Sequence, residues 1–314
     1  MPEGVAVGSD QLEAIRPQVL LYCYQMLGSP FDAQDAAQET LLRAWRHGDS
    51  YDASRASLRT WVHRIATNVC LTMLTARQRR PLPADLNPPG LDPAAPLVPD
   101  FETPWLQPAP SSWFATGQDD PAAQAVARGD LRIAITALLQ QLPARQRAAL
   151  ILRDVLGFTA QETAGQLDLT VAACNSALQR ARASLPLKRQ RPGTSSTEER
   201  QAVQRYAAAF LAADVEALVR LVSHDVRFEM PPVPAWSVGV EPYAAFMRHL
   251  FAWRGPDWQA SPLLVNGQHG LAVSRLVSGV PEPHTIQVFD LDPAGRISHV
   301  LVYHDPAIFR LLTS

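Results

Sequence analysis

The side chains best suited to recognising another molecule lie in a short stretch near residue 175. Asn175, Ser176, Gln179 and Arg180 recur at the three- and four-residue spacing that gathers side chains on one face of a helix. Amide and guanidinium groups hydrogen-bond to base edges in the major groove of DNA, and guanidinium groups also bind phosphates. This face therefore predicts contact with DNA.

A helix-turn-helix is expected to hold this face. A first helix ends at Gly157, and Thr159 and Glu162 have the capping-box spacing that begins a short second helix. After a turn that contains Asp168, Thr170 is the expected N-cap of the third helix. The inward stripe of that helix is Val171, Cys174, Leu178, Ala181 and Leu185. The outward positions, which are the candidate DNA contacts, are Thr170, Ala172, Asn175, Ser176, Gln179, Arg180 and Arg182.

An ordinary amphipathic helix with a solvated polar face has the same pattern. The stretch from Leu142 to Leu185, however, resembles the promoter-recognition domain (region 4) of extracytoplasmic-function (ECF) sigma factors, through LPARQRAALILRDVLGFTAQETA and NSALQRAR. The resemblance implies that the outward face reads the minus-thirty-five promoter element. Asp168 stands where the family usually has Gly, and Asp adopts a left-handed backbone less readily than Gly but more readily than most residues.

Charge is segregated along the 314 residues, although the net charge is only −2. Residues 127–191 hold ten Lys and Arg against four acidic residues, as a phosphate-binding surface requires, whereas residues 81–126 hold six acidic residues and no Lys or Arg. We expect a helical domain over 10–80, a Pro-rich acidic linker over 81–126, the helix-turn-helix domain over 127–190 and a third domain over 196–314. The fold class is multidomain, with two all-α domains and a C-terminal α+β domain.

Three helices are expected before residue 80. The first runs from Leu12 to Gly28, the second begins near Asp32, and the third begins after Ser57. A helix is also expected from Ala127 to Gln141. The third helix is expected to bury Leu58, Trp61, Val62, Ile65, Val69 and Met73, and to expose Arg59, His63, Arg64, Thr67, Asn68, Arg77, Arg79 and Arg80. From these residues alone, a three-helix bundle with a solvated polar edge and a basic end is the simpler interpretation.

Two stretches of this bundle, FDAQDAAQETLLRAWR and SLRTWVHRIATNVCLTMLTARQRR, resemble region 2 of the same family, in the same order relative to region 4. The resemblance implies that the second helix docks on the clamp helices of core RNA polymerase through Asp35, Gln38, Glu39, Leu42 and Arg46. It also implies that the third helix and its end open and read the minus-ten element, where bases must leave the stack before their edges are read. The candidate residues are Arg59, Trp61, Arg64, Asn68, Arg77, Arg79 and Arg80.

Trp105 and Leu106 interrupt the otherwise polar linker. Large apolar residues in such a tether favour docking on the protein's own domains, and we expect these two to dock on the C-terminal domain. In sigma factors the corresponding linker passes through the polymerase, so the resemblance also gives this acidic segment a place in a nucleic-acid channel.

The last domain combines helices with strand pairs that turn at Asn266-Gly267 and at Asp292–Gly295. It resembles the SnoaL-like, nuclear-transport-factor-two-like cone fold through DVEALVRLVSHDVRFEMPPVPAW and VYHDPAIF. Some members of that fold are isomerases or cyclases with an Asp–His pair in the cone, but scattered histidines are more often structural, and fold does not establish chemistry. The residues that would permit such a pair are His224, Asp225, Asp290, His299 and His304. The aromatic residues expected to line the cone are Phe228, Trp236, Phe246, Trp253, Trp258 and Phe289.

The sequence thus predicts a sigma factor with a C-terminal regulatory domain. The expected partners are core RNA polymerase, promoter DNA, and a small-molecule ligand or regulatory protein at the C-terminal domain. No catalytic residue, cofactor or metal site is expected, and Cys23, Cys70 and Cys174 have no disulfide or metal spacing. We expect no leader and no membrane span, and hence a cytoplasmic protein. Two alternatives are a ligand-responsive helix-turn-helix regulator that acts without polymerase, and a SnoaL-like small-molecule enzyme fused to DNA-binding domains.

Overall fold

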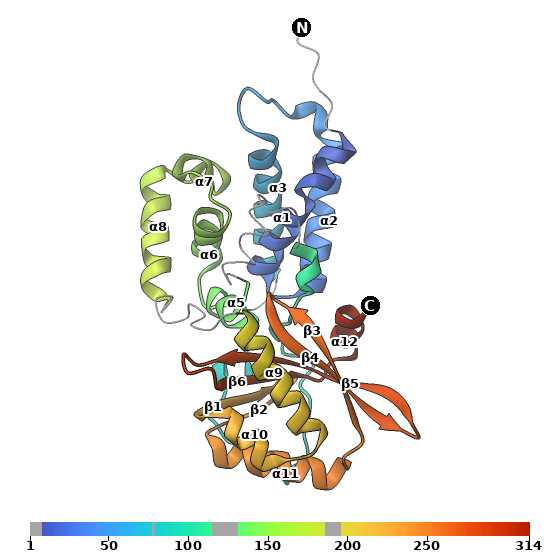
Figure 1. Ribbon diagram of the computed structural model, residues 1–314. Coiled ribbons are helices and arrows are strands. Elements are labelled where there is room, and N and C mark those ends of the chain that lie inside the picture. Colours follow the sequence, from blue (N-terminus) through green and yellow to red (C-terminus); the bar gives the residue numbers. More distant parts are fainter. Residues whose placement is uncertain (1–7, 77–78, 115–130, 186–195) are drawn as a thin grey trace. The chain divides into compact units, whose positions relative to one another are not determined.

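The chain forms two compact units, each made of two separate parts of the sequence. A computed structural model describes residues 8–76, 79–114, 131–185 and 196–314. Unit 1 combines Met1–Arg80 with Ser111–Gln190, and unit 2 combines Pro81–Pro110 with Arg191–Ser314. The described part of unit 1 is helical, and the described part of unit 2 contains a six-stranded sheet (Figure 1).

The first part of unit 1 is a bundle of α1 (Ser9–Leu27), α2 (Pro30–Arg46) and α3 (Leu58–Ala76). Gly28 ends α1 in the left-handed conformation that favours glycine, with φ of 69°. The Ser29 hydroxyl then accepts from the Asp32 backbone N–H and caps α2. The three helices predicted from the sequence are confirmed.

The second part of unit 1 contains the helix-turn-helix. The α-helices among its described residues are α5 (Ile133–Gln140), α6 (Ala144–Leu150), α7 (Ala160–Gln166) and α8 (Val171–Ser184), and a π-helical turn over Ile151–Val155 extends α6. The predicted capping box is present, because the Thr159 hydroxyl accepts from the Glu162 N–H at 3.2 Å and the Glu162 carboxylate accepts from the Thr159 N–H at 2.8 Å. The turn before α8 places Asp168 in the left-handed region, with φ of 52°.

The helix expected from Ala127 to Gln141 is described in part. The structure shows α5 from Ile133 onward, and the expected start of the helix lies outside the described residues. Its buried side carries Ile133, Thr136 and Leu139, whereas Ile135 and Leu138 are half-buried.

Unit 2 packs α-helices against its sheet. The helices α9 (Ser196–Leu211), α10 (Val215–Leu221) and α11 (Val240–Arg254) precede or interrupt the strands, and α12 (Pro306–Thr313) ends the chain. The strands are β1 (Val222–Met230), β2 (Val233–Val238), β3 (Trp258–Val265), β4 (Gln268–Val277), β5 (Val280–Leu291) and β6 (Ile297–Tyr303). Their order is β2-β1-β6-β5-β4-β3, with β1 and β6 parallel and the other neighbours antiparallel.

The concave side of this sheet holds an aromatic core with α9 and α11 over it (Figure 1). Tyr206, Phe228 and Phe289 are fully buried there. Asn266 and Gly267 both have positive φ, of 54° and 69°, as the two central residues of a type I′ hairpin turn require. The predicted α+β class and both predicted strand turns are confirmed, whereas β2 and α12 were not predicted.

Residues 81–110, which we call the strap, are joined to the rest of unit 2 by backbone hydrogen bonds. The N–H groups of Gly90 and Leu91 donate to the Trp236 carbonyl at 2.9 and 3.0 Å, and the Asp100 N–H donates to the Pro232 carbonyl at 2.8 Å. Much of the segment predicted to be a linker therefore belongs to a folded unit. Among the described residues, no helix combines the length and hydropathy that crossing a bilayer requires.

Candidate nucleic-acid interface

The predicted DNA-contacting face of α8 is exposed. Cys174, Ala177, Leu178 and Ala181 are buried on the opposite side of the helix. The exposed set matches the predicted outward set of Thr170, Ala172, Asn175, Ser176, Gln179, Arg180 and Arg182. Val171 was wrongly predicted to be inward and is 43% exposed, because it lies in the first turn, before the helix reaches the core.

Arg182 differs from the other members of this face because its guanidinium is already engaged. Its Nε and Nη2 donate to the Asp154 carboxylate at 2.9 and 2.5 Å. Such a two-point pair fixes the orientation of the guanidinium. It ties the end of α8 to the π-helical turn. Gln179 and Arg180 are therefore better placed than Arg182 to reach base edges of DNA.

The exposed face of α3 is narrower than the sequence indicated. Arg64 and Asn68 are exposed, but His63 and Thr67 were wrongly predicted to be outward and are fully buried. The Tyr22 hydroxyl lies 2.9 Å from the Thr67 hydroxyl, and the His63 ring packs between the rings of Tyr22 and Phe158. Burial lowers the pKa of His63 to about 4, so the ring is neutral at pH 7.

Two arginines of α3 bind the helix-turn-helix domain within unit 1. The Arg59 guanidinium donates to the Leu156 carbonyl at 2.5 Å and lies 4.0 Å from the centre of the Phe158 ring. Arg64 pairs with Asp168 at 2.9 Å. Arg59 and Arg64 are therefore candidate DNA contacts that are held by protein groups in this conformation.

A third polar contact and a cavity accompany these two arginines. The Thr60 hydroxyl donates to the Glu162 carboxylate at 2.9 Å, so the capping box of α7 also contacts α3. A cavity of about 590 Å³ lies alongside and is lined in part by Trp61 and Arg64. Trp61 is half-buried against the Tyr51 ring, with 5.4 Å between the ring centres.

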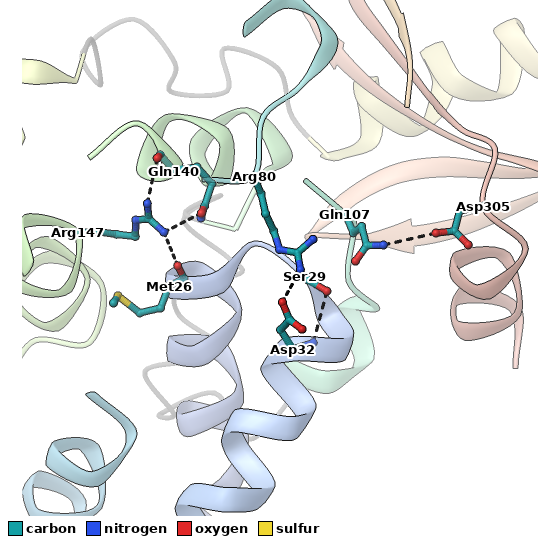
Figure 2. A network of polar contacts seen from close by, with 8 residues as sticks. All are labelled: Met26, Ser29, Asp32, Arg80, Gln107, Gln140, Arg147 and Asp305. Atoms are coloured by element: carbon teal, nitrogen blue, oxygen red, sulfur yellow. Dashed lines mark hydrogen bonds and ion pairs between the residues drawn. The ribbon is translucent and has the colours of Figure 1, made fainter. Parts of the chain in front are cut away.

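The arginines after α3 have different surroundings. Arg79 is exposed, and Arg77 lies outside the described residues. Arg80 was wrongly predicted to point outward, because its side chain is only 12% exposed and forms an ion pair with Asp32 (Figure 2). An arginine held in this way positions the end of the bundle instead of presenting a free cation.

Figure 2 also shows a buried arginine that the sequence did not single out. The Arg147 guanidinium donates to the Met26 carbonyl, to the Gln140 side-chain oxygen at 2.7 Å and to the Leu142 carbonyl at 3.2 Å. Burial lowers its pKa to about 10, so it keeps its charge at pH 7. Arg147 therefore links the end of α1 to α5 and α6, and part of the basic charge of residues 127–191 is structural.

The polymerase-binding face predicted on α2 is also solvent-accessible. Asp35, Gln38 and Arg46 are exposed, and Glu39 and Leu42 are half-buried. Glu39 pairs with Arg43 at 2.6 Å, one helical turn away. Trp45 lies next to this face and is 63% exposed. The sequence analysis did not identify Trp45 as a binding residue, although tryptophan is enriched in protein interfaces.

Asp290 and His299 meet, but outside the cone. His299 contacts Asp290 at 3.5 Å and Glu229 at 2.9 Å, and the Ala84 N–H of the strap donates to the other Glu229 oxygen at 2.8 Å. Neighbouring residues Phe228 and Val300 face the aromatic core, so the alternation of strands puts this cluster on the other face of the sheet. Burial alone would lower the pKa of His299, but the two carboxylates raise it to about 9.

The other residues considered for an Asp–His pair are dispersed. His224 and Asp225 are exposed, and Asp225 accepts from the Ser223 hydroxyl. His304 lines the cone beside His284, with no acidic residue among the described lining residues. Six aromatic residues were predicted to line the cone. A cavity in the cone is lined by three of them, Phe228, Phe246 and Trp253, and two more, Trp258 and Phe289, belong to the aromatic core. Trp236 was wrongly predicted, because its indole N–H donates to the Asn87 carbonyl of the strap.

Trp105 and Leu106 are buried, at 6% and 0% exposure. The Trp105 indole N–H donates to the Asp100 carbonyl at 2.6 Å, and the Leu106 N–H donates to the Pro81 carbonyl at 3.1 Å. The first hydrogen bond closes a local turn of the strap, and the second brings its two ends together.

Comparison with known proteins defines the class. Family models match three segments: "Sigma-70 region 2" over residues 12–80, "Sigma-70, region 4" over 132–185 and "SnoaL-like domain" over 203–300. The chain is thus a sigma-70-type protein with an additional SnoaL-like domain.

The relatives narrow the class further. The ECF RNA polymerase sigma factor SigG of Mycobacterium tuberculosis (strain H37Rv) is 39% identical over 310 residues, which cover 96% of this chain and 82% of SigG. The chain belongs to the ECF RNA polymerase sigma factors. SigJ of the same organism is 29% identical over 278 residues, covering 85% of this chain and 81% of SigJ. The crystal structure of M. tuberculosis SigJ has the same fold, with a TM-score of 0.66 at 23% identity, and covers 98% of this chain and 99% of that one.

Proposed function

We propose that this chain binds core RNA polymerase, directs initiation from specific promoters, and is regulated through its C-terminal domain. The observation that carries the proposal is the 39% identity to an ECF sigma factor along 96% of the chain. A DNA-binding regulator that acts without polymerase would leave the region 2 match over residues 12–80 without a role. We accordingly expect the protein to work in the cytoplasm, where polymerase and promoter DNA are found.

We assign recognition of the minus-thirty-five element to the exposed face of α8. The Gln179 and Asn175 amides suit adenine, and the Arg180 guanidinium suits guanine, in each case through paired hydrogen bonds in the major groove. Arg182 is oriented by Asp154 and is better suited to a phosphate.

We assign the minus-ten element to α3 and the segment that follows it. Arg64 and Asn68 supply exposed polar groups, and Arg79 adds a cation at the end of the helix. Because Arg59 and Arg64 contact Leu156 and Asp168, these contacts must break before α3 can use both arginines on DNA. The conformation described here therefore corresponds to a less active state in this proposal.

We assign polymerase binding to α2. Asp35 and Gln38 are exposed one turn before Leu42, and Trp45 adds a large apolar surface beside them. An acidic and apolar face of this kind suits a basic, partly apolar partner surface.

Regulation is assigned to the strap. In this family the linker between the two DNA-binding domains passes through the polymerase, so a strap held by Trp236 and Pro232 cannot take that path at the same time. The strap is thus either docked on the C-terminal domain or released from it. A ligand or partner protein can shift the balance between these two states only if its affinity for them differs.

We assign no catalytic activity to the C-terminal domain. Asp290, His299 and Glu229 form a salt-bridged cluster beside the strap residue Ala84, and His284 and His304 line the cone, where none of the described lining residues is acidic. This arrangement favours a regulatory domain over an isomerase-like enzyme.

Transcription in vitro with core polymerase and a candidate promoter tests the main proposal. Gln179→Ala and Arg180→Ala should each reduce discrimination between promoter and mutated minus-thirty-five DNA by about 1–3 kcal/mol. Arg200→Ala, which removes an exposed arginine from α9, is the matched control and should have no effect. Unchanged selectivity in both α8 variants would refute the assignment of that face.

Pull-down with core polymerase tests the α2 assignment. The double variant Asp35→Lys with Glu39→Lys should weaken binding, while Glu13→Lys, on an exposed site of α1, should not. Equal affinity of all three proteins would favour a regulator that acts without polymerase.

Transcription by truncated and strap-destabilised proteins tests the regulatory role. Truncation after Thr194 and, separately, Trp105→Ala should raise promoter-dependent transcription at equal protein concentration if the strap restrains activity. Lower activity of both variants would assign a positive role to the C-terminal domain, and no change in either would remove the regulatory assignment.

A further inference from the structure

Two of the four acidic residues in the basic segment 127–191 contact α3. Asp168 pairs with Arg64, with 2.9 Å between its Oδ1 atom and the Nη2 atom of the arginine. The Glu162 carboxylate accepts from the Thr60 hydroxyl at 2.9 Å. Because like charges repel, an acidic residue weakens the attraction of a DNA-binding segment for phosphates. These two residues therefore act against phosphate binding by their own domain, and both are engaged with α3.

The contacts with α3 come from the first half of the helix-turn-helix. Leu156 directly follows the π-helical turn and accepts from Arg59, and Phe158 lies under the same guanidinium. Glu162 lies in α7, and Asp168 lies in the turn before α8. None of these four residues of the domain belongs to α8, whose outward face stays exposed. The helix-turn-helix domain thus contacts α3 without using its recognition helix.

The Asp168 carboxylate binds Arg64 as a DNA phosphate would. A guanidinium group forms the same charge-assisted hydrogen bonds with carboxylates and with phosphates. Both side chains of this pair are more than half exposed to solvent. An ion pair this accessible changes an equilibrium by at most about fivefold, so DNA or salt can break it. The pair is therefore suited to a reversible contact.

We propose that the helix-turn-helix domain is an intramolecular inhibitor of α3, in which Asp168 and Glu162 hold Arg64 and Thr60 in place of the DNA backbone. In this closed arrangement the outward face of α8 can meet duplex DNA, whereas α3 cannot bind the minus-ten strand. Release of the domain from α3 frees the minus-ten residues. The inference rests on the proposed role of α3 in minus-ten recognition. It is separate from the restraint assigned to the strap, because all these contacts lie within unit 1.

Binding of a minus-ten strand to the full chain tests the inhibitory contact. The probe is a fluorescently labelled single-stranded oligonucleotide with the minus-ten sequence of the promoter used for transcription, and anisotropy reports its binding. Asp168→Asn should bind it about two- to fivefold more tightly, because a larger fraction of the protein is then open. Asparagine also adopts the left-handed backbone of Asp168, so the turn is retained. Asp257→Asn, the same change at an exposed site of unit 2, should leave binding unchanged.

A double-mutant cycle separates the contact with Arg64 from a general effect of charge. Removing any acidic residue from this domain makes it more attractive to DNA, whereas the inhibitory contact requires Arg64 as well. Asp168→Asn should therefore give no further gain in a chain that already carries Arg64→Ala. A gain of equal size in both backgrounds would overturn the inference.

Energy transfer between two dyes measures the closed arrangement without DNA. Cys23, Cys70 and Cys174 are buried, so dyes can be placed on Glu13→Cys in α1 and Ser184→Cys in α8, both at exposed sites. Salt screens exposed ion pairs, so raising its concentration should lower the transfer efficiency of the otherwise unmodified chain. Adding Asp168→Asn should lower it already at low salt. Equal transfer with and without Asp168→Asn at low salt would overturn the inference.

The Arg64→Ala variant distinguishes failure of the inference from failure of the proposed function. Arg64→Ala should weaken binding of the minus-ten strand. If it does not, the proposed role of α3 is lost, and the inference is lost with it. If Arg64→Ala weakens binding but Asp168→Asn changes neither binding nor energy transfer, only the inference is lost.

Discussion

Replacing His299 should remove a pH-dependent part of the stability of unit 2. The folded-state pKa of His299 is about 9, and the ordinary value is 6.5. Below pH 6.5 the imidazole is protonated in both folded and unfolded chains, so its ion pairs with Glu229 and Asp290 stabilise the fold fully. As the pH rises from 6.5 to 9 the unfolded chain loses this proton first, and the stabilisation is lost.

The size of this effect follows from the pKa difference. At 1.36 kcal/mol per pKa unit, the change from 6.5 to about 9 corresponds to roughly 3 kcal/mol. For a unit of this size, 1 kcal/mol shifts Tm by about 2–4 °C, which gives about 6–12 °C. The pKa of Glu229 is lowered, so its own contribution is lost only below its ordinary value of 4.5, outside this range.

Thermal unfolding of the full chain at pH 6.5, 8 and 9.5 measures this effect. His299→Gln leaves two carboxylates without their cation, so it should unfold at a much lower temperature than the unmodified chain at pH 6.5. The difference in Tm between the variant and the unmodified chain should narrow by about 6–12 °C towards pH 9.5. His224→Gln, at an exposed site, is the control. A gap that stays constant across this pH range would refute a charged His299 in the folded protein.

Three further substitutions should destabilise the fold by different mechanisms. Gly270→Ala should cost about 1–3 kcal/mol in urea unfolding, because its Cβ would lie 2.7 Å from the Gln287 carbonyl oxygen and force β4 and β5 apart. Asp32→Ala should cost up to about 3–5 kcal/mol, since it leaves Arg80 largely buried without that carboxylate, and an unchanged midpoint would contradict this role. Thr159→Ala should cost about 1 kcal/mol by removing the N-cap of α7, measured in the same way, and no loss would mean that the cap is replaced by water.

Local signals in the sequence predicted the helices and turns well. The caps at Thr159 and Thr170 and the turn at Asn266-Gly267 depend on residues within four positions of each other, so a linear pattern contains all the information. The exposed face of α8 followed from the same periodicity.

Contacts between distant segments were the part that the sequence could not provide. His63 and Thr67 look outward on a helical wheel, but Tyr22 and Phe158 cover them from other helices. The strap residue Leu97 stands in a segment without periodicity, and only the fold shows that it reaches the cone.

The contact between Glu229 and His299 also joins segments that are distant in the sequence. It depends on the parallel pairing of β1 with β6, two strands that are separated by most of the domain. An Asp–His pair was considered from the sequence, but its position on the outer face of the sheet follows from that pairing alone.

The interleaved construction of the two units bears on how the chain is made. The strap is synthesised well before residues 196–314, on which it packs, and the helix-turn-helix segment lies between them in the sequence. At about 5–20 residues per second, the remaining two hundred or so residues take roughly 10–40 s to follow the strap out of the ribosome. During that interval the two DNA-binding domains are completed and can fold while the strap has no sheet to pair with. Every newly made molecule therefore passes through a stage in which its strap is unengaged, and the docked state is reached only after β6 has been synthesised.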